Sequence, residues 1–479
     1  MLKNSNFCIV GLGTSGQAVA AYLAKRGMAF YAADSRKRSP ELEQFKKSLE
    51  PTGLLKDLFL GEFEPNLFCR PDIDILIVSP GVPCAHLAIQ QAKQQGKKII
   101  GDIELFAQEV GKYCPNHKVV GITGSNGKST VTTLVGALLI AYATQKNHLN
   151  KIKVVAAGNI GLPVLTALDN LITETPNLSE IQVYFVLELS SFQLETTHSL
   201  SVAVACILNI SPNHLDRYEN LTGYIQAKKS IYQHAQAVVY NREDKATYPD
   251  KIYLNNIKNQ ITFGLGTSSE KQFGLCVENN QLFLASGQKK YIPVSDLKLM
   301  GRHNYANSLA ALAIIKALNI EISVELLEAL KVFSGLPHRC EWVADINHVQ
   351  WINDSKATSI GAVKAAVEGI APYVATGKVI LIAGGDGKGA DFREMVPVLE
   401  KYVQAVILIG RDAHKIAEVV PASIPKLMAE VIDKAVLIAQ NLAKPGDTVL
   451  LSPICASWDQ YPSYIARGEH FKNCVLKLI

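Results

Sequence analysis

Short apolar runs rich in β-branched residues recur along this chain, and each is followed by a glycine-rich turn and a helix-like segment. Continuous apolar runs of this kind are typical of parallel strands that helices cover on both faces. The alternation of strand and helix therefore predicts an α/β fold built on mainly parallel sheets. The runs that define it are Phe7–Val10, Ile73–Val78, Val119–Ile122, Val183–Leu187, Val202–Leu208, Val379–Ala383, Ala405–Ile409 and Thr448–Leu451.

At 479 residues the chain exceeds what one hydrophobic core usually supports, so about two to four domains are expected. The strand–helix pattern lapses at Gly111–Lys118 and again at Phe333–Pro337. These lapses predict three domains, at residues 1–112, 113–335 and 336–479. Between about Asn241 and Ser295 the sequence changes to short polar segments with many turn residues, which favours a small antiparallel region in the middle domain.

Composition narrows the class of protein. Hydrophobic residues make up 48% and charged residues 19%, and the net charge of +5 is spread without a Lys/Arg run. A nucleic-acid binder would show a basic stripe, so the excess of positive charge favours anionic small molecules as partners. The nine cysteines stand singly, with neither a CxxC pair nor a zinc-finger spacing, which indicates reduced thiols in a cytoplasm.

No segment predicts a leader or a membrane anchor. The first residues run almost directly into the strand-like Phe7–Val10, without the charged, apolar and cleavage regions of a signal peptide. The longest helical apolar stretch, Val131–Ala143, is shorter than the roughly 20 residues that cross a bilayer. We therefore expect a cytoplasmic enzyme, not inserted in a membrane and monomeric.

The strongest local motif is Gly121–Thr130, with the sequence GITGSNGKST. It follows a predicted strand and opens a predicted helix, so its backbone N–H groups can surround phosphate oxygens next to the positive end of the helix dipole. In such a loop Lys128 would reach the β- and γ-phosphates of a nucleotide, and the Ser129 hydroxyl could ligate Mg²⁺. The alternative is a glycine-rich turn with an incidental lysine.

A carboxylate follows a later strand. Glu188 ends the apolar run Tyr184–Leu187 and precedes Leu189–Gln193. At the carboxyl end of a strand beside a phosphate loop, it is well placed to ligate Mg²⁺. Taken alone, such a residue is more often a solvated strand end.

A second glycine-rich loop, Gly11–Gly16, has the pattern GxGxxG after the first strand, and Asp34 ends the next strand-like segment. This pattern is typical of a dinucleotide site and would suggest NAD. The same geometry suits any pyrophosphate, because close backbone approach and a helix N-terminus are what it supplies.

Beyond these motifs the chain resembles the Mur ligase family, and within it the members that add D-glutamate. The family's motifs occur in its order over nearly the whole length. They are GITGSNGKST at Gly121–Thr130, GNIG at Gly158–Gly161, ELSSFQLE at Glu188–Glu195, HLDRY at His214–Tyr218, GRHNYAN at Gly301–Asn307, LPHR at Leu336–Arg339, NDSKAT at Asn353–Thr358, GGDGKGADF at Gly384–Phe392 and LLSPICASWDQY at Leu450–Tyr461.

The resemblance implies a fold and a reaction. The fold would have an N-terminal Rossmann-like domain, a central P-loop ATPase-like domain and a C-terminal Rossmann-like domain. ATP would phosphorylate the alanine carboxylate of UDP-N-acetylmuramoyl-L-alanine, and D-glutamate would displace phosphate from the acyl phosphate. Because implied ATP residues lie in two domains, catalysis should require domain closure. A sister ligase for another amino acid, a nicotinamide-dependent oxidoreductase and a non-catalytic relative are the alternatives.

The resemblance also implies roles for individual residues. ATP would be bound by Gly124, Asn126, Gly127, Lys128, Ser129, Thr130, Asn304, Asn307, Arg339, Asp354 and Lys356. Catalysis would depend on Lys128, Glu188, His214 and Lys228, and two Mg²⁺ ions would be held by Ser129, Glu188, His214 and a carbamylated Lys228. The UDP-substrate would contact Thr14, Ser15, Asp34, Ser35, Arg36, Gly81, Asn159 and His214, and D-glutamate would contact Thr358, Lys388, Ser457 and Tyr464.

Two of these lysines have a physical rationale. Carbamylation of Lys228 needs a neutral amine and yields an anion that can organise a metal shell. Without the family, Lys228 would be interpreted as a solvated helix charge. Lys388 supplies a point charge in a glycine-rich loop, as a dianionic amino acid requires.

Overall fold

The computed structural model describes residues 5–145, 150–211, 217–218, 220–254, 257, 259–299, 301–371 and 378–479. The chain divides into two compact units. The first comprises Met1–Leu275, Ala285–Lys290 and Leu309–Leu327, and the second Cys276–Leu284, Tyr291–Ser308 and Glu328–Ile479.

The first sheet of the first unit has the strand order β3-β2-β1-β4-β5, and every pair is parallel. From β1 the chain adds β2 and β3 on one side of the sheet, and then β4 and β5 on the other side. Because the strand order reverses between β1 and β4, a ligand is expected beyond the carboxyl ends of these two strands. The strands are β1 (Phe7–Val10), β2 (Phe30–Asp34), β3 (Leu55–Leu60), β4 (Ile75–Val78) and β5 (Lys98–Ile100). The helices are α1 (Thr14–Lys25), α2 (Pro40–Leu49), α3 (Leu87–Gln94) and α4 (Asp102–Tyr113).

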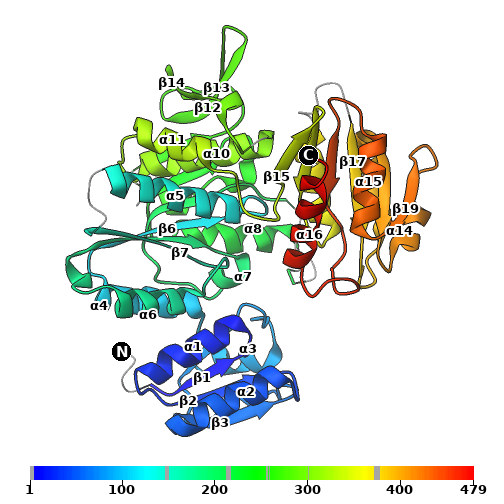
Figure 1. Ribbon diagram of the computed structural model, residues 1–479. Helices are drawn as coiled ribbons and strands as arrows, with labels where there is room; N and C mark the ends of the chain where they lie inside the picture. Colours follow the sequence, from blue (N-terminus) through cyan, green and yellow to red (C-terminus); the bar gives the residue numbers. More distant parts are fainter. Residues whose placement is uncertain are drawn as a thin grey trace. The chain divides into compact units, whose positions relative to one another are not determined.

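A larger sheet has the order β14-β13-β12-β11-β10-β9-β6-β8-β7, and its pairs from β7 to β11 are parallel. In Figure 1, α5 lies on one side of β6 and β7, and α4 and α6 lie on the other. The parallel strands are β6 (His117–Thr123), β7 (Ile152–Gly158), β8 (Gln182–Glu188), β9 (Val202–Ile207), β10 (Ala235–Asn241) and β11 (Asn259–Phe263). The helices are α5 (Lys128–Gln145), α6 (Val164–Glu174), α7 (Ser191–Leu194), α8 (Leu221–Lys229), α9 (Lys251–Leu254), α10 (Arg302–Ala317) and α11 (Val324–Val332).

The predicted antiparallel region is confined to β12 (Gln272–Glu278), β13 (Gln281–Ser286) and β14 (Lys289–Pro293). These neighbouring strands are joined by two-residue turns, which require antiparallel pairing. Asn279 and Asn280 form the first turn with φ of 49° and 61°, as a type I′ hairpin turn requires. The preceding β11 instead pairs parallel to β10.

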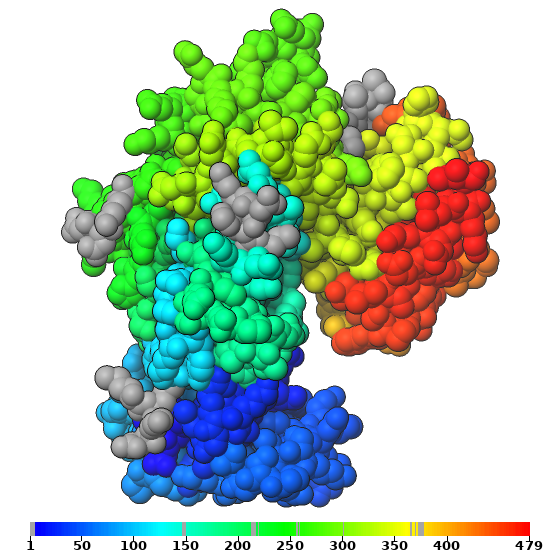
Figure 2. Space-filling view, turned by 60° about the vertical axis from the view of Figure 1, so that its left-hand side comes forward, coloured from blue at the N-terminus to red at the C-terminus, as the bar shows by residue number. Residues whose placement is uncertain are grey.

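One hydrophobic core runs through the first unit. It joins side chains of α1, β1, β2 and α4 to side chains of α6, β8 and β9. Phe106 of α4 packs against Phe185 of β8, with ring centroids 5.0 Å apart. Where α1 meets α6, Arg26 donates to Asp169 across 2.9 Å. In Figure 2 the dark-blue N-terminal part of the first unit lies directly against the cyan part of the same unit.

The second unit contains a six-stranded sheet in the order β15-β16-β20-β17-β18-β19, parallel except for the β15–β16 pair. One core lies under α12, α13 and α14, and another lies under α15 and α16 on the opposite face. The strands are β15 (Glu341–Ile346), β16 (Val349–Asn353), β17 (Val379–Gly384), β18 (Val403–Ile409), β19 (Lys426–Glu430) and β20 (Thr448–Leu451). The helices are α12 (Ile360–Ile370), α13 (Val396–Tyr402), α14 (Ala413–Val419), α15 (Ile432–Leu442) and α16 (Tyr464–Leu476). The α/β fold class predicted from the sequence is confirmed.

Candidate active site

Four parallel strands of the larger sheet end side by side, and polar segments follow each of them. In the order β9, β6, β8 and β7, they lead into Asn209, the glycine-rich segment Gly121–Thr130 (the P-loop), Glu188 and Asn159. Within the P-loop Gly124 and Gly127 have φ of 153° and 82°, values that favour glycine. The loop leads directly into α5, so backbone N–H groups at the start of that helix are available to an anion.

Asn209 holds the loop in this shape. Its side-chain carbonyl accepts from the Asn126 N–H at 2.8 Å, and its amide donates to the Asn126 carbonyl at 3.1 Å. Ser125 is fixed by Tyr224, whose hydroxyl lies 3.1 Å from its own. Neither Asn209 nor Tyr224 was predicted from the sequence. The one local signal was the position of Asn209 just after a predicted strand.

Two lysine amines share one carbonyl of this loop. Lys128 Nζ donates to Gly124 O at 3.0 Å, and Lys228 Nζ donates to the same oxygen at 2.9 Å. Lys228 also lies 3.3 Å from Thr123 Oγ1 and is only 2% exposed. Its interpretation as a solvated helix charge is therefore wrong.

The surroundings of Lys228 disfavour its ammonium form. Burial, and then the positive charge of Lys128, lower the pKa of Lys228 to about 6, although Glu188 partly opposes the shift. The neighbouring Lys229 is held differently, in a 2.6 Å ion pair with Asp250. Of the two adjacent lysines, Lys228 is therefore the one with a neutral amine near neutral pH.

Glu188 is buried, with 3% of its surface exposed, so it is not a solvated strand end. Asn159 donates to Glu188 Oε1 at 2.8 Å, and its backbone N–H donates to the Glu188 carbonyl at 2.8 Å. The other carboxylate oxygen, Oε2, is buried and has no hydrogen-bond partner within the described parts of the chain. A buried carboxylate oxygen without a donor fits a cation ligand. His214, the other predicted metal ligand, lies outside the described residues.

The Gly11–Gly16 loop borders a separate pocket of about 520 Å³ in the first unit. The pocket brings together most of the residues predicted for the UDP-substrate, and it adds Gln193 from the ELSSFQ segment. Its lining includes Thr14, Ser15, Asp34, Ser35, Arg36, Gly81, Asn159 and Gln193.

Asp34 organises one end of this pocket. Its carboxylate accepts from the Leu12 N–H at 2.7 Å and from Arg36 Nε at 2.8 Å. Burial would raise the pKa of Asp34, but these hydrogen bonds and the backbone N–H of Arg36 together lower it. The carboxylate therefore stays ionised, and Arg36 Nη2 also donates to it, at 3.0 Å.

The three glycines of this loop differ in the space that a Cβ atom would have. A Cβ on Gly16 would collide with the Gly11 carbonyl oxygen, which shows how closely α1 approaches the strand end. Gly11 has φ of 88°, and a Cβ there would meet Val82 at 2.7 Å. A Cβ on Gly13 would meet no atom within 4 Å, so that side of the loop is open to a ligand.

In the second unit, Asp354 is buried between two donors. It accepts from the Cys340 N–H at 3.1 Å and from the Ser452 hydroxyl at 2.7 Å. Burial raises the pKa of Asp354 to about 7, partly offset by these hydrogen bonds and by the charge of Arg339. Arg339 is exposed, and Lys356 lies 5.4 Å above the Tyr464 ring. In the same unit, Asn307 donates to Asn304 at 3.1 Å, and both side chains are buried.

Two loops predicted for D-glutamate lie side by side. Asp386 and Ala456 exchange backbone hydrogen bonds of 2.9 Å, which ties the GGDGK loop to the CASW loop. Lys388 Nζ lies 4.0 Å above the Trp458 ring, and the residue before Trp458, Ser457, is buried. Thr358 is exposed.

Comparison with known proteins identifies the family. Residues 5–101 match the N-terminal domain described as MurD-like Mur ligase, residues 122–315 match the Mur ligase middle domain, and residues 338–455 match the Mur ligase glutamate ligase domain. The chain belongs to the Mur ligase family.

Individual relatives cover this Mur ligase almost completely. The UDP-N-acetylmuramoylalanine--D-glutamate ligase of Legionella pneumophila strain Paris is 40% identical over 99% of both chains. The enzyme of that name from Saccharophagus degradans is 43% identical over 98% of this chain and 97% of its own. The crystal structure of MurF from Thermotoga maritima in complex with ADP shares the fold, with a TM-score of 0.57, 15% identity, and coverage of 94% of this chain and 96% of that one.

Within the described part of this Mur ligase, no helix combines the length and apolarity needed to cross a bilayer.

Proposed function

We propose that this Mur ligase joins D-glutamate to the alanine carboxylate of UDP-N-acetylmuramoyl-L-alanine, with conversion of ATP to ADP and phosphate. The observation that carries the proposal is near-complete coverage by D-glutamate ligases at 40% and 43% identity. The reaction belongs to peptidoglycan precursor synthesis and forms an amide bond. We place the enzyme in the cytoplasm, as a monomer.

The ATP site of this proposal is built on the P-loop. Gly124, Asn126, Gly127, Ser129 and Thr130 would surround the phosphates at the start of α5, and Lys128 would exchange its carbonyl acceptors for phosphate oxygens. The positive φ angles of Gly124 and Gly127 and the helix N-terminus at Lys128 support this role. The residues assigned to ATP further along the chain are Asn304, Asn307, Arg339, Asp354 and Lys356.

Glu188 and Ser129 would hold Mg²⁺, with His214 and Lys228 at a second ion. The unpartnered Oε2 of Glu188 supports this assignment. Bound Mg²⁺ supplies positive charge to the phosphates during transfer. We propose that Lys228 is carbamylated, because its amine is buried and favours the neutral form that attacks CO₂.

The pocket beside Gly11–Gly16 would take the UDP part of the substrate. The open side of Gly13 admits a pyrophosphate to the backbone N–H groups, and Asp34 is an anionic acceptor for uracil or ribose donors. That end of the pocket is also lined by Thr14, Ser15, Ser35, Arg36 and Gly81. Asn159 lines the same pocket and donates a hydrogen bond to Glu188. No step of this reaction requires hydride transfer, so a nicotinamide is not expected here.

Lys388, Ser457, Thr358 and Tyr464 would bind D-glutamate. The pairing of the GGDGK and CASW loops supports a common site for Lys388 and Ser457. With these assignments, residues 1–112 bind the UDP-substrate, residues 113–335 bind ATP, and residues 336–479 bind D-glutamate and complete the ATP site.

The chemistry follows from charge and position. The alanine carboxylate attacks the γ-phosphorus of ATP, the bond to ADP breaks, and an acyl phosphate forms. The amine of D-glutamate then attacks the acyl carbon, loses a proton, and expels phosphate. Lys128 offsets charge on the transferred group, and Asn159 holds the Glu188 carboxylate in place.

The test is ADP release from UDP-N-acetylmuramoyl-L-alanine and ATP with D-glutamate, L-glutamate, L-lysine or meso-diaminopimelate. D-Glutamate should be the preferred acceptor. Preference for another amino acid would instead favour a sister ligase.

A further inference from the structure

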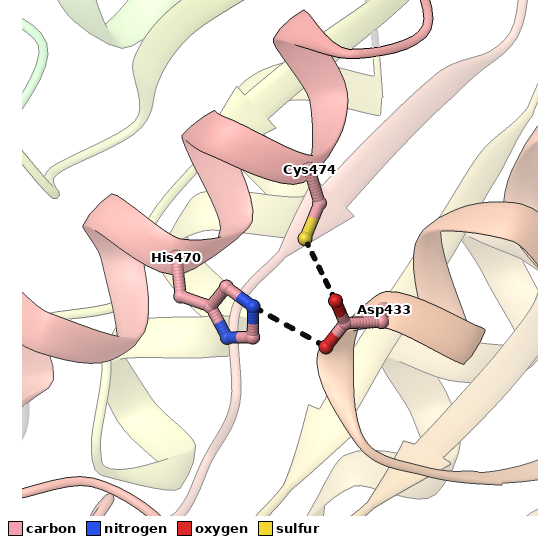
Figure 3. A group of neighbouring side chains, drawn as sticks. All are labelled: Asp433, His470 and Cys474. Atoms are coloured by element: carbon pink, nitrogen blue, oxygen red, sulfur yellow. Dashed lines mark hydrogen bonds and ion pairs between the residues drawn. The ribbon is translucent and has the colours of Figure 1, made fainter.

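A group of three side chains of types that can ligate a metal lies in the second unit, between α15 and α16, among residues to which no role has been given (Figure 3). Asp433 is in the first turn of α15. His470 and Cys474 are four residues apart on α16, so both project from the same face of that helix. Figure 3 shows both side chains directed at the Asp433 carboxylate.

Two of the separations are close to those between ligands of one ion, each measured to a different oxygen of the Asp433 carboxylate. His470 Nε2 lies 3.2 Å from Asp433 Oδ2, and Cys474 Sγ lies 3.5 Å from Asp433 Oδ1. The three ligand atoms all lie within 4.8 Å of one another. In a tetrahedral zinc site with ordinary bond lengths, the separation between neighbouring ligand atoms is about 3.3–3.5 Å. Only small side-chain movements would place all three around one cation.

A hydrogen bond at Nδ1, on the side of the ring away from Asp433, orients the imidazole of His470. The Tyr461 hydroxyl lies 2.8 Å from Nδ1, so Nε2 is the nitrogen that faces Asp433 and Cys474. If Nε2 bound a metal, Nδ1 would carry the proton and donate it to the Tyr461 oxygen. Such a second hydrogen bond is usual behind a metal-bound histidine.

We propose that Asp433, His470 and Cys474 bind a divalent transition cation, Zn²⁺ by preference. Imidazole, thiolate and carboxylate together favour this class over Mg²⁺, which prefers oxygen ligands alone. A water would complete a four-coordinate shell, since Asp433 is exposed and opens the site to solvent. On binding, the Cys474 thiol proton is released and the thiolate bonds to the cation. The ion would cross-link α15 to α16 and stabilise this unit.

The test uses the full-length, tag-free protein after treatment with a chelator, titrated with Co²⁺ in saturating Mg²⁺. One equivalent should produce a thiolate-to-cobalt charge-transfer band, and Zn²⁺ should abolish the band and raise Tm. Co²⁺ at an oxygen-ligated ATP site gives no thiolate band, so the two sites are distinguished.

Cys474→Ser and His470→Gln should lose the band. Cys276→Ser, which changes a half-buried cysteine elsewhere, should keep it. Tyr461→Phe should keep the band but weaken Zn²⁺ binding roughly tenfold. If wild type gives no band, or if Asp433→Asn and Cys474→Ser bind Co²⁺ as wild type does while remaining folded by circular dichroism, the proposal is wrong and the group is an ion pair with a neighbouring thiol.

Discussion

The amine of Lys228 lies between Gly124 O and Thr123 Oγ1 in a place that water hardly reaches. A proton added there would sit close to the Lys128 ammonium without the hydration it has in the unfolded chain. The folded protein therefore binds that proton less readily than the unfolded chain does, and stability depends on pH.

The sign follows from the shift. Burial lowers the pKa of Lys228 from 10.5 to about 6, so between these values the unfolded chain binds the additional proton. The free energy of unfolding therefore rises as pH rises through that window. At pH 7 most of the destabilisation caused by burying Lys228 remains. In CO₂-free buffer, Lys228→Met should raise the free energy of unfolding at pH 7 by on the order of 2 kcal/mol. The gain should shrink by pH 9, as measured by urea unfolding at both values.

Lys229→Met is the matched control, because Lys229 is paired with Asp250. It should not flatten the pH dependence. An equal slope in wild type and Lys228→Met would mean that Lys228 is charged in the folded protein.

Lys228 also permits a test of its proposed carbamate. Lys228→Ala should lower the ligation rate roughly 100-fold, because the anion that organises the second metal shell is lost. Acetate should restore part of the rate by filling the vacated space. Activity retained in Lys228→Ala, or rescue by acetate of Lys229→Ala instead, would contradict the assignment.

Lys388 is the charge proposed for a D-glutamate carboxylate, held 4.0 Å above the Trp458 ring. Lys388→Ala should raise the KM for D-glutamate about tenfold or more, since a charge-assisted hydrogen bond is lost. The KM for ATP should stay close to wild type. Lys415→Ala, which removes a lysine paired with Asp412, is the control and should change neither constant. Equal effects of Lys388→Ala on both constants would argue against the placement.

At the level of helices and strands, the sequence predicts the most continuous apolar strands but misses several edge strands, and it also misses β10 and β16, which are largely buried. β1 and β20 match the predicted runs residue for residue, and both are buried along their full length. β3, β7 and β19 were not among the apolar runs; they are edge strands with polar, partly exposed residues. A strand with one neighbour needs no continuous apolar run, so its signal is weak.

The residues of the candidate site also divide into those that the local sequence pattern predicts and those that it does not. Lys128 opens the helix after a glycine-rich loop and Glu188 ends a strand, so both positions could be predicted from local pattern. Asn209 and Tyr224 act on the P-loop from 83 and 99 residues away, and no local spacing reports such contacts. The burial of Lys228 is likewise a property of the fold, since its helix carries lysines on adjacent positions.

The turn between β1 and α1 gives a prediction at this scale. Gly13→Val should leave the fold intact, because a Cβ there meets no atom within 4 Å, but it should abolish binding of the UDP-substrate. Gly16→Val should instead destabilise the protein by several kcal/mol, because its Cβ would collide with the Gly11 carbonyl. Calorimetry with the UDP-substrate and thermal unfolding separate the two effects. Retained UDP-substrate binding in Gly13→Val would refute the pocket assignment.

Across the whole molecule, the hydrophobic cores are distributed unequally. The two cores of the six-stranded sheet consist only of residues within 336–479. The core of the first unit runs from Phe7 to Val238 and includes the Phe106–Phe185 contact. Residues 1–112 therefore have one core of their own, which includes Phe63, Phe68 and Leu76, and share the other core with later residues of the first unit.

Expressed alone, residues 336–479 should unfold cooperatively, with a free energy of about 5 kcal/mol or more. Residues 1–112 alone should bind a hydrophobic dye or aggregate, because the face of α4 that carries Phe106 would be uncovered. Chemical unfolding and dye fluorescence of the two fragments check this. A stable, dye-free fragment 1–112 would show that the shared core is dispensable.

The carbonyl of Gly124 accepts from both Lys128 and Lys228. If Lys128 turns toward a nucleotide, that oxygen loses one of its two donors but keeps the other, so it is not left without a hydrogen bond. Lys228 would then be the remaining lysine donor to that oxygen, and a carbamate on its nitrogen would leave one N–H where the neutral amine has two. Nucleotide capture and carbamate formation would each change the hydrogen bonding of this one oxygen, so the order in which ATP and CO₂ are added should affect how quickly the enzyme reaches full activity.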